Sequence, residues 1–472
     1  MLFNKNTIFF EAFMFLFFIR IKFFSIILIF FTFFNLSKIM ASDFTFEYSI
    51  HQALKNSLEL KAQNYRLAAA KHSLGEANSS KDWTNSFSTV FNSTNKDINS
   101  DGSFEADETT TSTISISKNI FDGGEAFEKY SIAEDSLKLQ QFSFVKIEQK
   151  VILESIKAYL DVYSNQSVVR LRKRSLERFK ENVEATKLKL EAGTVTPTVL
   201  AEAQSKYAKA KYELILAEGN LNNSTSNFKS ITKLKNVPGN IKLPKLNFKV
   251  PKTVNKAVKI SLNNNPLILV AKLEKDIAKK NIDLKRSNNR PSFKVEFFGK
   301  DSQSSVNTSA SDYQSYGANL TFSTPLFYND STKDTIRRLD KLSTATSFDL
   351  FEKNRQVEFS TISSYQNYKS AIAKTSASKS EKKSLFLALN GIKKEAQFGI
   401  RTVLDVLDAE VEYLNASTNV IKNEADEIYS QFYIKSILGN LSISDINREY
   451  KVNYDMKENA LKFNILDHKT FN

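Results

Sequence analysis

Two similar stretches, 206 residues apart, show that this chain uses one structural unit twice. They read GTVTPTVLAEAQ at 193–204 and GIRTVLDVLDAE at 399–410. Aligned position by position, they place Gly193 on Gly399 and Thr196 on Thr402. A repeat of roughly 200 residues restricts the chain to folds in which two copies of one supersecondary unit pack together.

Each of these stretches has the features of a turn between two helices. A glycine follows a long charged, helix-favouring run, and a second helical pattern begins within about four residues. The sequence therefore predicts helical tips at about 193–198 and 397–402. The same offset aligns NIFDGG at 119–124 with PLFYND at 325–330, so the repeat extends well upstream of the tips.

Long helices are expected to lead into both tips. Between Gly124 and about residue 190 the chain has no Pro and no Gly, and apolar residues recur every three or four positions. Some 67 residues at about 1.5 Å each make a helix of roughly 100 Å, which needs a partner helix along its length. The second half predicts a matching helix over about 331–396. Shorter helices are expected to return from each tip, to about 230 and about 439.

A further helix is predicted at the start of each half. Residues 44 to about 80 and about 253 to 287 carry apolar residues at helical spacing. We expect each of these two segments to form one unbroken amphipathic helix.

Four short segments alternate between apolar and polar residues, as strands with one apolar face do. Phe293, Val295 and Phe297, for example, oppose Lys294 and Glu296. Such strands of about nine or ten residues suit a membrane β-barrel with a wet lumen, and a soluble antiparallel sheet is the alternative. Four strands cannot close a barrel alone, so the barrel interpretation requires an oligomer. The predicted strands lie at about 83–93, 111–120, 292–300 and 315–323, and the polar stretches 94–108 and 301–311 are expected to be loops.

The first 41 residues read as a secretory signal peptide. Lys22 precedes the apolar run FFSIILIFFTFF, and small residues follow at Ala41. A retained membrane anchor is the rival interpretation, and under either the remainder is exported. We therefore divide the chain into a signal at 1–41, a first repeat at 42–240, a second repeat at 241–440 and a tail at 441–472.

The order of elements, with NIFDGG after the second strand and GIRTVLDVLDAE at the second tip, resembles the TolC-like outer-membrane channel family of drug efflux and type I secretion. The resemblance covers about 44 to 440. It implies a mainly α fold with a membrane β-barrel portion, in which a homotrimer shares a 12-stranded barrel above an α-helical tunnel in the periplasm. It also implies a passive outer-membrane duct that receives substrates from an inner-membrane ABC or RND-type pump through a periplasmic adaptor (membrane fusion) protein.

Two aspartates just past the second tip are the candidates for an entrance ring. Asp405 and Asp408 lie at i and i+3, on one helical face. Three chains would bring six carboxylates around one axis, a ring that favours cations, and both residues match the family's aspartate rings. The competing interpretation is two solvated acids near a helix N-terminus, where the helix dipole favours them.

Arg401 matches the family's tip arginine, which holds the entrance shut by contacting a neighbouring hairpin. Thr198 matches a partner position, but Val199 stands where the family pattern has Asp, so Arg401 lacks its expected carboxylate. Glu202, one turn after Thr198, is the candidate substitute. We therefore predict a gate latch of Arg401, Thr198 and Glu202 that is wired differently from the family pattern. The resemblance also makes the tip glycines Gly193 and Gly399 the docking surface for the adaptor.

Catalysis, cofactors and nucleic-acid binding find little support in the sequence. The chain has no cysteine, and its three histidines are scattered without metal-ligand spacing. Its net charge of +14 comes from lysines mixed with glutamates along helices, not from one basic patch. We expect no enzyme, cofactor or metal site and no nucleic-acid partner, although the barrel would contact outer-membrane lipid. The alternative function is a non-conducting periplasmic coiled-coil adaptor or scaffold, which would usually carry a single helical hairpin.

Overall fold

The computed structural model describes residues 45–97, 104–244, 250–304, 312–327 and 330–442. The chain divides after Ser49 into two compact units. The described residues of the first unit, 45–49, hold only the start of the first described helix, and the architecture given below belongs to the second unit. The predicted signal peptide and nearly all of the predicted tail lie outside the described residues.

The two halves of the chain contain the same order of elements: two shorter helices, a β-hairpin, a long helix and a return helix. The first half holds α2 (Phe46–Asn56), α3 (Leu58–Ser79), β1 (Thr84–Asp97), β2 (Phe104–Phe121), α4 (Glu125–Glu191) and α5 (Pro197–Thr232). The second half holds α6 (Val254–Asn264), α7 (Pro266–Ser287), β3 (Ser292–Ser304), β4 (Tyr313–Ser323), α8 (Asp330–Gln397) and α9 (Val403–Ile437).

Each half begins with two helices, so the prediction of one unbroken helix there is wrong. At Ser57 and Asn265 the backbone is extended, and the side chain caps the helix that follows. Ser57 accepts a hydrogen bond from the Leu60 amide, and Asn265 accepts one from the Leu267 amide at 2.9 Å. Pro266, directly after Asn265, disfavours helical geometry at the residue before it. The second break thus had a signal in the sequence.

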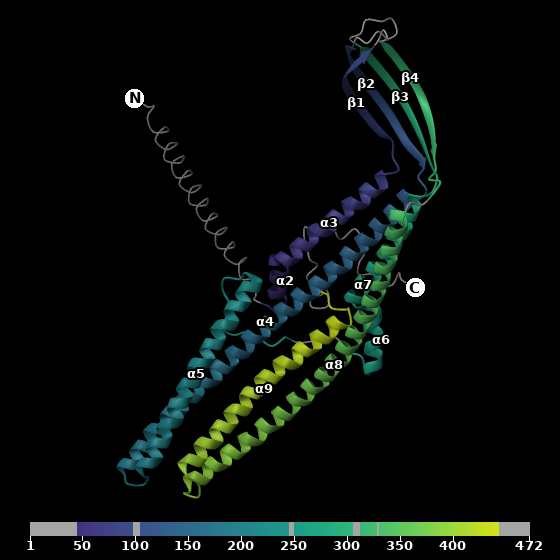
Figure 1. The fold of residues 1–472 in the computed structure, drawn as a ribbon. Helices are drawn as coiled ribbons and strands as arrows, with labels where there is room; N and C mark the ends of the chain where they lie inside the picture. Colours follow the sequence, from purple (N-terminus) through teal and green to yellow (C-terminus); the bar gives the residue numbers. More distant parts are fainter. Residues whose placement is uncertain (1–44, 98–103, 245–249, 305–311, 328–329, 443–472) are drawn as a thin grey trace, which may run out of the picture. The chain divides into compact units, whose positions relative to one another are not determined.

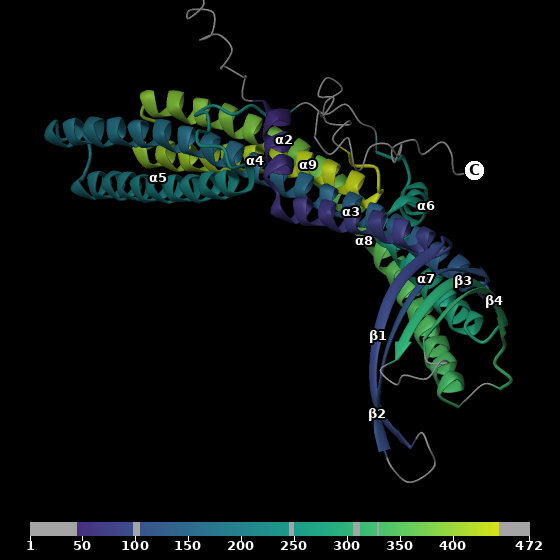
Figure 2. The ribbon, with the colours of Figure 1, turned by 90° about the horizontal axis from the view of Figure 1, so that it is seen from above.

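The long helices lie beside two or more shorter helices. α4 packs against α3 and α5, and α8 packs against α6, α7 and α9. Figures 1 and 2 show α5 beside the half of α4 that leads to the first tip, and α9 beside the half of α8 that leads to the second tip. Contacts of α4 with α7 and α9 join the first half to the second.

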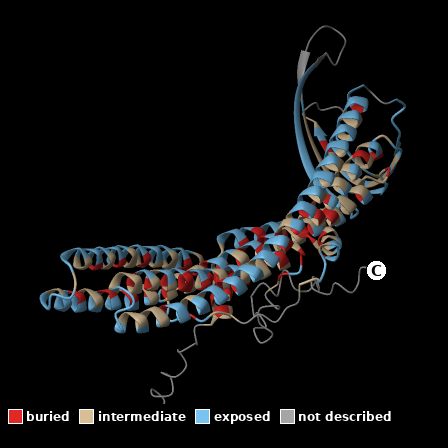
Figure 3. Ribbon diagram, turned by 90° about the horizontal axis from the view of Figure 1, so that it is seen from below, coloured by how far each residue is buried: buried red, intermediate tan, exposed pale blue. Residues whose placement is uncertain are grey.

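The core follows the helix interfaces. Buried residues recur on the helix faces that are turned towards one another, while the outer faces are exposed (Figure 3). On α4, Ile152, Ile156 and Val162 are fully buried. Nearer the tips, Phe179 of α4 packs with Ala203 of α5 and Leu407 of α9 in one cluster. This apolar burial is what keeps helices of such length associated.

The strands form one antiparallel sheet in the order β1-β2-β3-β4. β1 continues to Asp97 and β2 begins at Phe104, so they extend well into the stretch 94–108 that we predicted as a loop. β3 likewise runs on to Ser304. The pairing continues there because extended, polar residues on neighbouring strands still satisfy each other's backbone hydrogen bonds. Polarity indicated a loop, whereas backbone pairing decided the strand ends.

The register places most of the apolar residues of the four strands on one face. Phe87 pairs with Ile114, and Ile114 pairs with Gly299, which pairs with Tyr316. On this apolar face Tyr316 is 92% exposed and Leu320 is 73% exposed. The opposite face carries mainly Ser, Thr and Asn together with a few charged residues. None of the helices among the described residues has an apolar stretch long enough to cross a bilayer.

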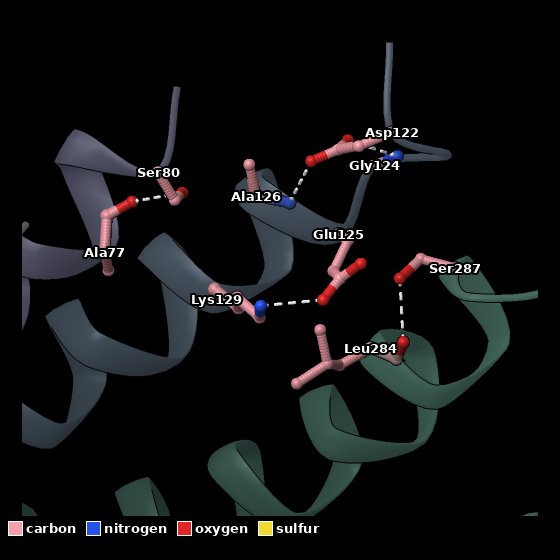
Figure 4. Close-up of polar contacts among 9 residues, drawn as sticks. All are labelled: Ala77, Ser80, Asp122, Gly124, Glu125, Ala126, Lys129, Leu284 and Ser287. Carbon is pink, nitrogen blue, oxygen red and sulfur yellow. Dashed lines mark hydrogen bonds and ion pairs between the residues drawn. The ribbon is translucent and has the colours of Figure 1, made fainter. Parts of the chain in front are cut away.

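The start of α4 connects the sheet to the helices. The Asp122 carboxylate accepts hydrogen bonds from the Gly124 amide at 3.0 Å and the Ala126 amide at 2.7 Å, as Figure 4 shows. Gly123 and Gly124 both have positive φ, 71° and 92°. A Cβ atom on Gly123 would lie 2.5 Å from the backbone carbonyl oxygen of Ser287, at the end of α7. This junction therefore depends on glycine both for backbone conformation and for space.

We predict that Gly123→Ala destabilises the protein more than Gly124→Ala does. Both substitutions strain a left-handed residue, at about 1 kcal/mol or more, but only the first also collides with the α7 backbone. Gly75→Ala in α3 is the control, because nothing lies within 4 Å of its added Cβ and alanine favours a helix. Thermal unfolding followed by circular dichroism measures the three variants. Equal midpoints for Gly123→Ala and Gly124→Ala would contradict the prediction.

A second prediction concerns a half-buried carboxyl on α4. Glu148 lies one turn before the buried Ile152, and desolvation raises the pKa of its carboxyl to about 7. Because the pKa is higher in the folded than in the unfolded protein, the free energy of unfolding is highest below pH 4.5, the ordinary pKa. It falls as the pH rises to about 7, the folded-state pKa. We expect Glu148→Gln to remove up to about 3 kcal/mol of this pH-dependent loss. Unfolding midpoints at pH 5 and pH 8 test it, with exposed Glu177→Gln as the control. If the unfolding midpoint falls by the same amount from pH 5 to pH 8 in Glu148→Gln and Glu177→Gln, the prediction is wrong.

Candidate functional site

Both helical tips close with the same backbone motif. The Thr194 amide donates to the Lys189 carbonyl oxygen, and the Ile400 amide donates to the Glu395 carbonyl oxygen, each at 2.9 Å. Gly193 and Gly399 supply the left-handed residue, with φ of 72° and 77°. This six-to-one hydrogen bond with a left-handed glycine is the Schellman motif that ends many helices. No atom crowds either glycine, so conformation alone requires glycine there.

The return helices begin at the aligned residues Thr196 and Thr402. At Thr402 the cap is reciprocal. The Asp405 amide donates to the Thr402 hydroxyl at 3.1 Å, and the Thr402 amide donates to the Asp405 carboxylate at 2.8 Å. The Thr402 amide and the Thr402 hydroxyl both donate to the Asp405 carboxylate, and together with nearby Arg401 they hold the pKa of that carboxyl below its ordinary value. Asp405 is thus an ionised capping residue in the single chain.

Asp408 contacts a different element from Asp405. Its exposed carboxylate forms an ion pair with the ammonium group of Lys206, which joins α9 to α5. The two candidate ring residues therefore share a face but not a partner. Asp405 stabilises its own helix start, and Asp408 links the second hairpin to the first.

The candidate latch residues are not brought together within one chain. Arg401 donates from Nε to the Glu395 carboxylate at 3.0 Å, across the base of its own turn. Thr198 and Glu202 are exposed on α5, at the other tip. Within one chain, Glu395 thus takes the place at Arg401 that we expected Glu202 to take.

The most buried charged residue near the tips is Glu410 of α9, which our sequence reasoning did not select. Glu410 is only 2% exposed and accepts a hydrogen bond from Arg178 of α4 at 2.9 Å. The ammonium group of Lys393, on α8, lies 3.8 Å from its second oxygen. Three helices from both hairpins thus meet at one carboxylate. The signal was its spacing, since Leu407, Glu410 and Leu414 form one buried stripe.

Comparison with known proteins gives this geometry its context. The family model described as "Outer membrane efflux protein" matches residues 49–232 and 257–440, the two repeats in turn. The chain belongs to this outer membrane efflux protein family. Members of the family are channels and not enzymes, so this chain is a TolC-family efflux channel of the outer membrane.

Individual relatives agree with the family assignment. The chain is 24% identical to the outer membrane protein TolC of Escherichia coli, over 71% of each chain. It is 21% identical to the outer membrane efflux protein BepC of Brucella suis, over 72% of this chain and 75% of that protein. The alkaline protease secretion protein AprF of Pseudomonas aeruginosa is 22% identical over 84% of both. Relatives named for efflux and for secretion thus both share this architecture.

Solved structures confirm the fold. The Campylobacter jejuni CmeC outer membrane channel superposes with a TM-score of 0.70 at 16% identity, over 89% of this chain and 90% of that one. The outer membrane protein VceC of Vibrio cholerae gives 0.70 at 14% identity, over 84% and 96%. The mainly helical fold with two repeats, each containing a β-hairpin, is therefore the one that the sequence predicted. The family membership also decides against the adaptor or scaffold interpretation.

We predict that Glu410→Ala loosens the contact between the two hairpins. It leaves Arg178 and Lys393 without their shared carboxylate, and breaking a buried pair costs up to 3–5 kcal/mol. Because the Arg178 side chain is 48% exposed, we expect the lower range of about 1–2 kcal/mol. Thermal unfolding measures the loss, and exposed Glu412→Ala on the same helix is the control. If Glu410→Ala and Glu412→Ala unfold at the same temperature, Glu410 does not stabilise the contact between the hairpins.

Proposed function

We propose that three copies of this chain assemble into one channel and share a single β-barrel. The observation that carries this proposal is a four-stranded sheet with β1 and β4 at its edges and an exposed apolar face. Unpaired strand edges are costly in a membrane, where every backbone group needs a partner. Edge pairing of β4 with β1 of the next copy satisfies both edges, and three copies supply twelve strands.

The apolar face of that barrel contacts lipid, and the polar face lines the lumen. β1, β2, β3 and β4 have 14, 18, 13 and 11 residues, and about 9–11 tilted residues cross a bilayer. The alternation of the strands supports this assignment, because membrane barrels keep apolar residues outside and polar residues inside.

The helices form a passive duct through the periplasm, and the tips face the partner proteins. We propose that a periplasmic adaptor protein docks at the two tips and connects the channel to an inner-membrane pump of the ABC or RND type. The small, exposed residues at Gly193 and Gly399 leave room for an approaching hairpin. The pump supplies the energy and selects the cargo, as fits relatives named for efflux and for protease secretion.

At the entrance, Asp405 and Asp408 of three copies form a cation-favouring ring. Lys206 offsets part of the charge of Asp408, so the ring attracts cations less strongly than six free carboxylates would. Arg401 with Glu395 braces each second tip, while Thr198 and Glu202 remain available to an Arg401 from a neighbouring copy.

Single-channel current through the mature chain, 42–472, in a planar bilayer tests the channel and its entrance. We expect stable, cation-preferring current that a multivalent cation blocks from the helical side. The double variant Asp405→Asn with Asp408→Asn keeps the cap acceptor but removes the charge. It should weaken the block about tenfold or more, because each carboxylate near the cation contributes about 1 kcal/mol in water.

Glu412→Ala is the control for surface charge and should leave the block unchanged. A monomeric, water-soluble protein without current would overturn the trimeric channel proposal. Normal current with an undiminished block in the double variant would overturn the entrance ring alone.

A further inference from the structure

One row of residues on the polar face of the sheet contains a single large side chain. Ser86 pairs with Ser115, Ser115 with Phe298, and Phe298 with Gly317. The Ser86 and Ser115 hydroxyls lie 2.8 Å apart and form a hydrogen bond. The row therefore reads small, small, aromatic, small across the four strands.

The Phe298 ring lies across the neighbouring strand. A Cβ atom on Gly317 would be 3.1 Å from Cζ and 3.2 Å from Cε1 of Phe298, so the ring occupies the space above that glycine. Gly299, the residue that follows Phe298, has no atom within 4 Å of an added Cβ. Glycine weakens a strand, and its presence often marks a close approach. The outer end of the Phe298 ring thus packs over Gly317 on the neighbouring strand.

Charged residues of both signs flank the ring along β3. Glu296 and Lys300 lie two residues to either side, on the same polar face. The neighbouring row towards Lys300 holds Ser88, Thr113 and Ser315, and the row towards Glu296 holds Thr84, Ser117 and Asn319. The Lys300 ammonium group lies 5.3 Å from the centre of the Tyr313 ring, and the Glu296 carboxylate lies 3.9 Å from the Lys294 ammonium group. Both flanking charges therefore have partners of their own, and the half-buried Phe298 ring lies among small polar side chains.

We propose that Phe298 is a lumenal binding patch for aromatic or apolar solutes that pass through the barrel. The patch rests on the proposed function, since it requires the polar face to line the lumen. Three copies would place three such rings at one level of the wall. Aromatic pairs contribute about 0.5–1.5 kcal/mol beyond their buried area, enough to slow a passing solute without trapping it.

The test is block of single-channel current through the mature chain by tetraphenylphosphonium, an aromatic cation. We expect Phe298→Ala to weaken the block about fivefold, which corresponds to about 1 kcal/mol of aromatic contact. Phe298→Leu keeps the apolar volume without the ring and should give a smaller loss. Block by tetrabutylammonium, which has no ring, should change less in both variants.

Phe297→Ala is the matched control, because Phe297 is the adjacent residue in β3 and lies on the apolar face. It should leave the block unchanged. Conducting wild type whose block is the same in Phe298→Ala, Phe298→Leu and Phe297→Ala would overturn the patch and leave Phe298 as a strand-packing residue. A block sensitive to Phe297 and not to Phe298 would reverse the assignment of the two faces. A wild type that inserts but never conducts would instead overturn the proposed function itself.

Discussion

Burial of one side of each long helix against shorter helices is the constraint on which the other features depend. α4 and α8 have 67 and 68 residues, far more than an ordinary helix of a globular protein. Neither is stable without partner helices along its length. The partners are supplied twice by the same plan, α3 and α5 for α4, and α7 and α9 for α8. Because α4 also contacts α9, the two halves are joined near the tips.

That junction near the tips combines an apolar cluster with ionic contacts. Phe179 and Leu407 pack beside Ala203, and the Arg178 to Glu410 ion pair lies on the same helices α4 and α9. The apolar contacts hold the hairpins together, whereas the ionic contacts depend on an aligned register of α4 and α9.

The sheet separates two environments by strand alternation alone. One face gathers exposed Phe, Ile, Leu and Tyr, and the other gathers hydroxyl and amide side chains. Val90, Phe298 and Tyr313 depart from that rule, because the register places them on the polar face. Among them, Phe298 packs its ring over Gly317 of the neighbouring strand.

The sequence by itself determined the repeat, the two glycine tips, the long helices and the alternation of the strands. These features depend on neighbours within a few residues, through helical periodicity, capping and glycine at positive φ. Tertiary structure decided which charged groups meet. Lys206 contacts Asp408 and Arg178 contacts Glu410 across more than 200 residues. Such contacts depend on the rotation and relative shift of packed helices, which no local pattern specifies. Strand ends were decided in the same way, because polar residues that look like a loop complete their backbone hydrogen bonds once a partner strand is present.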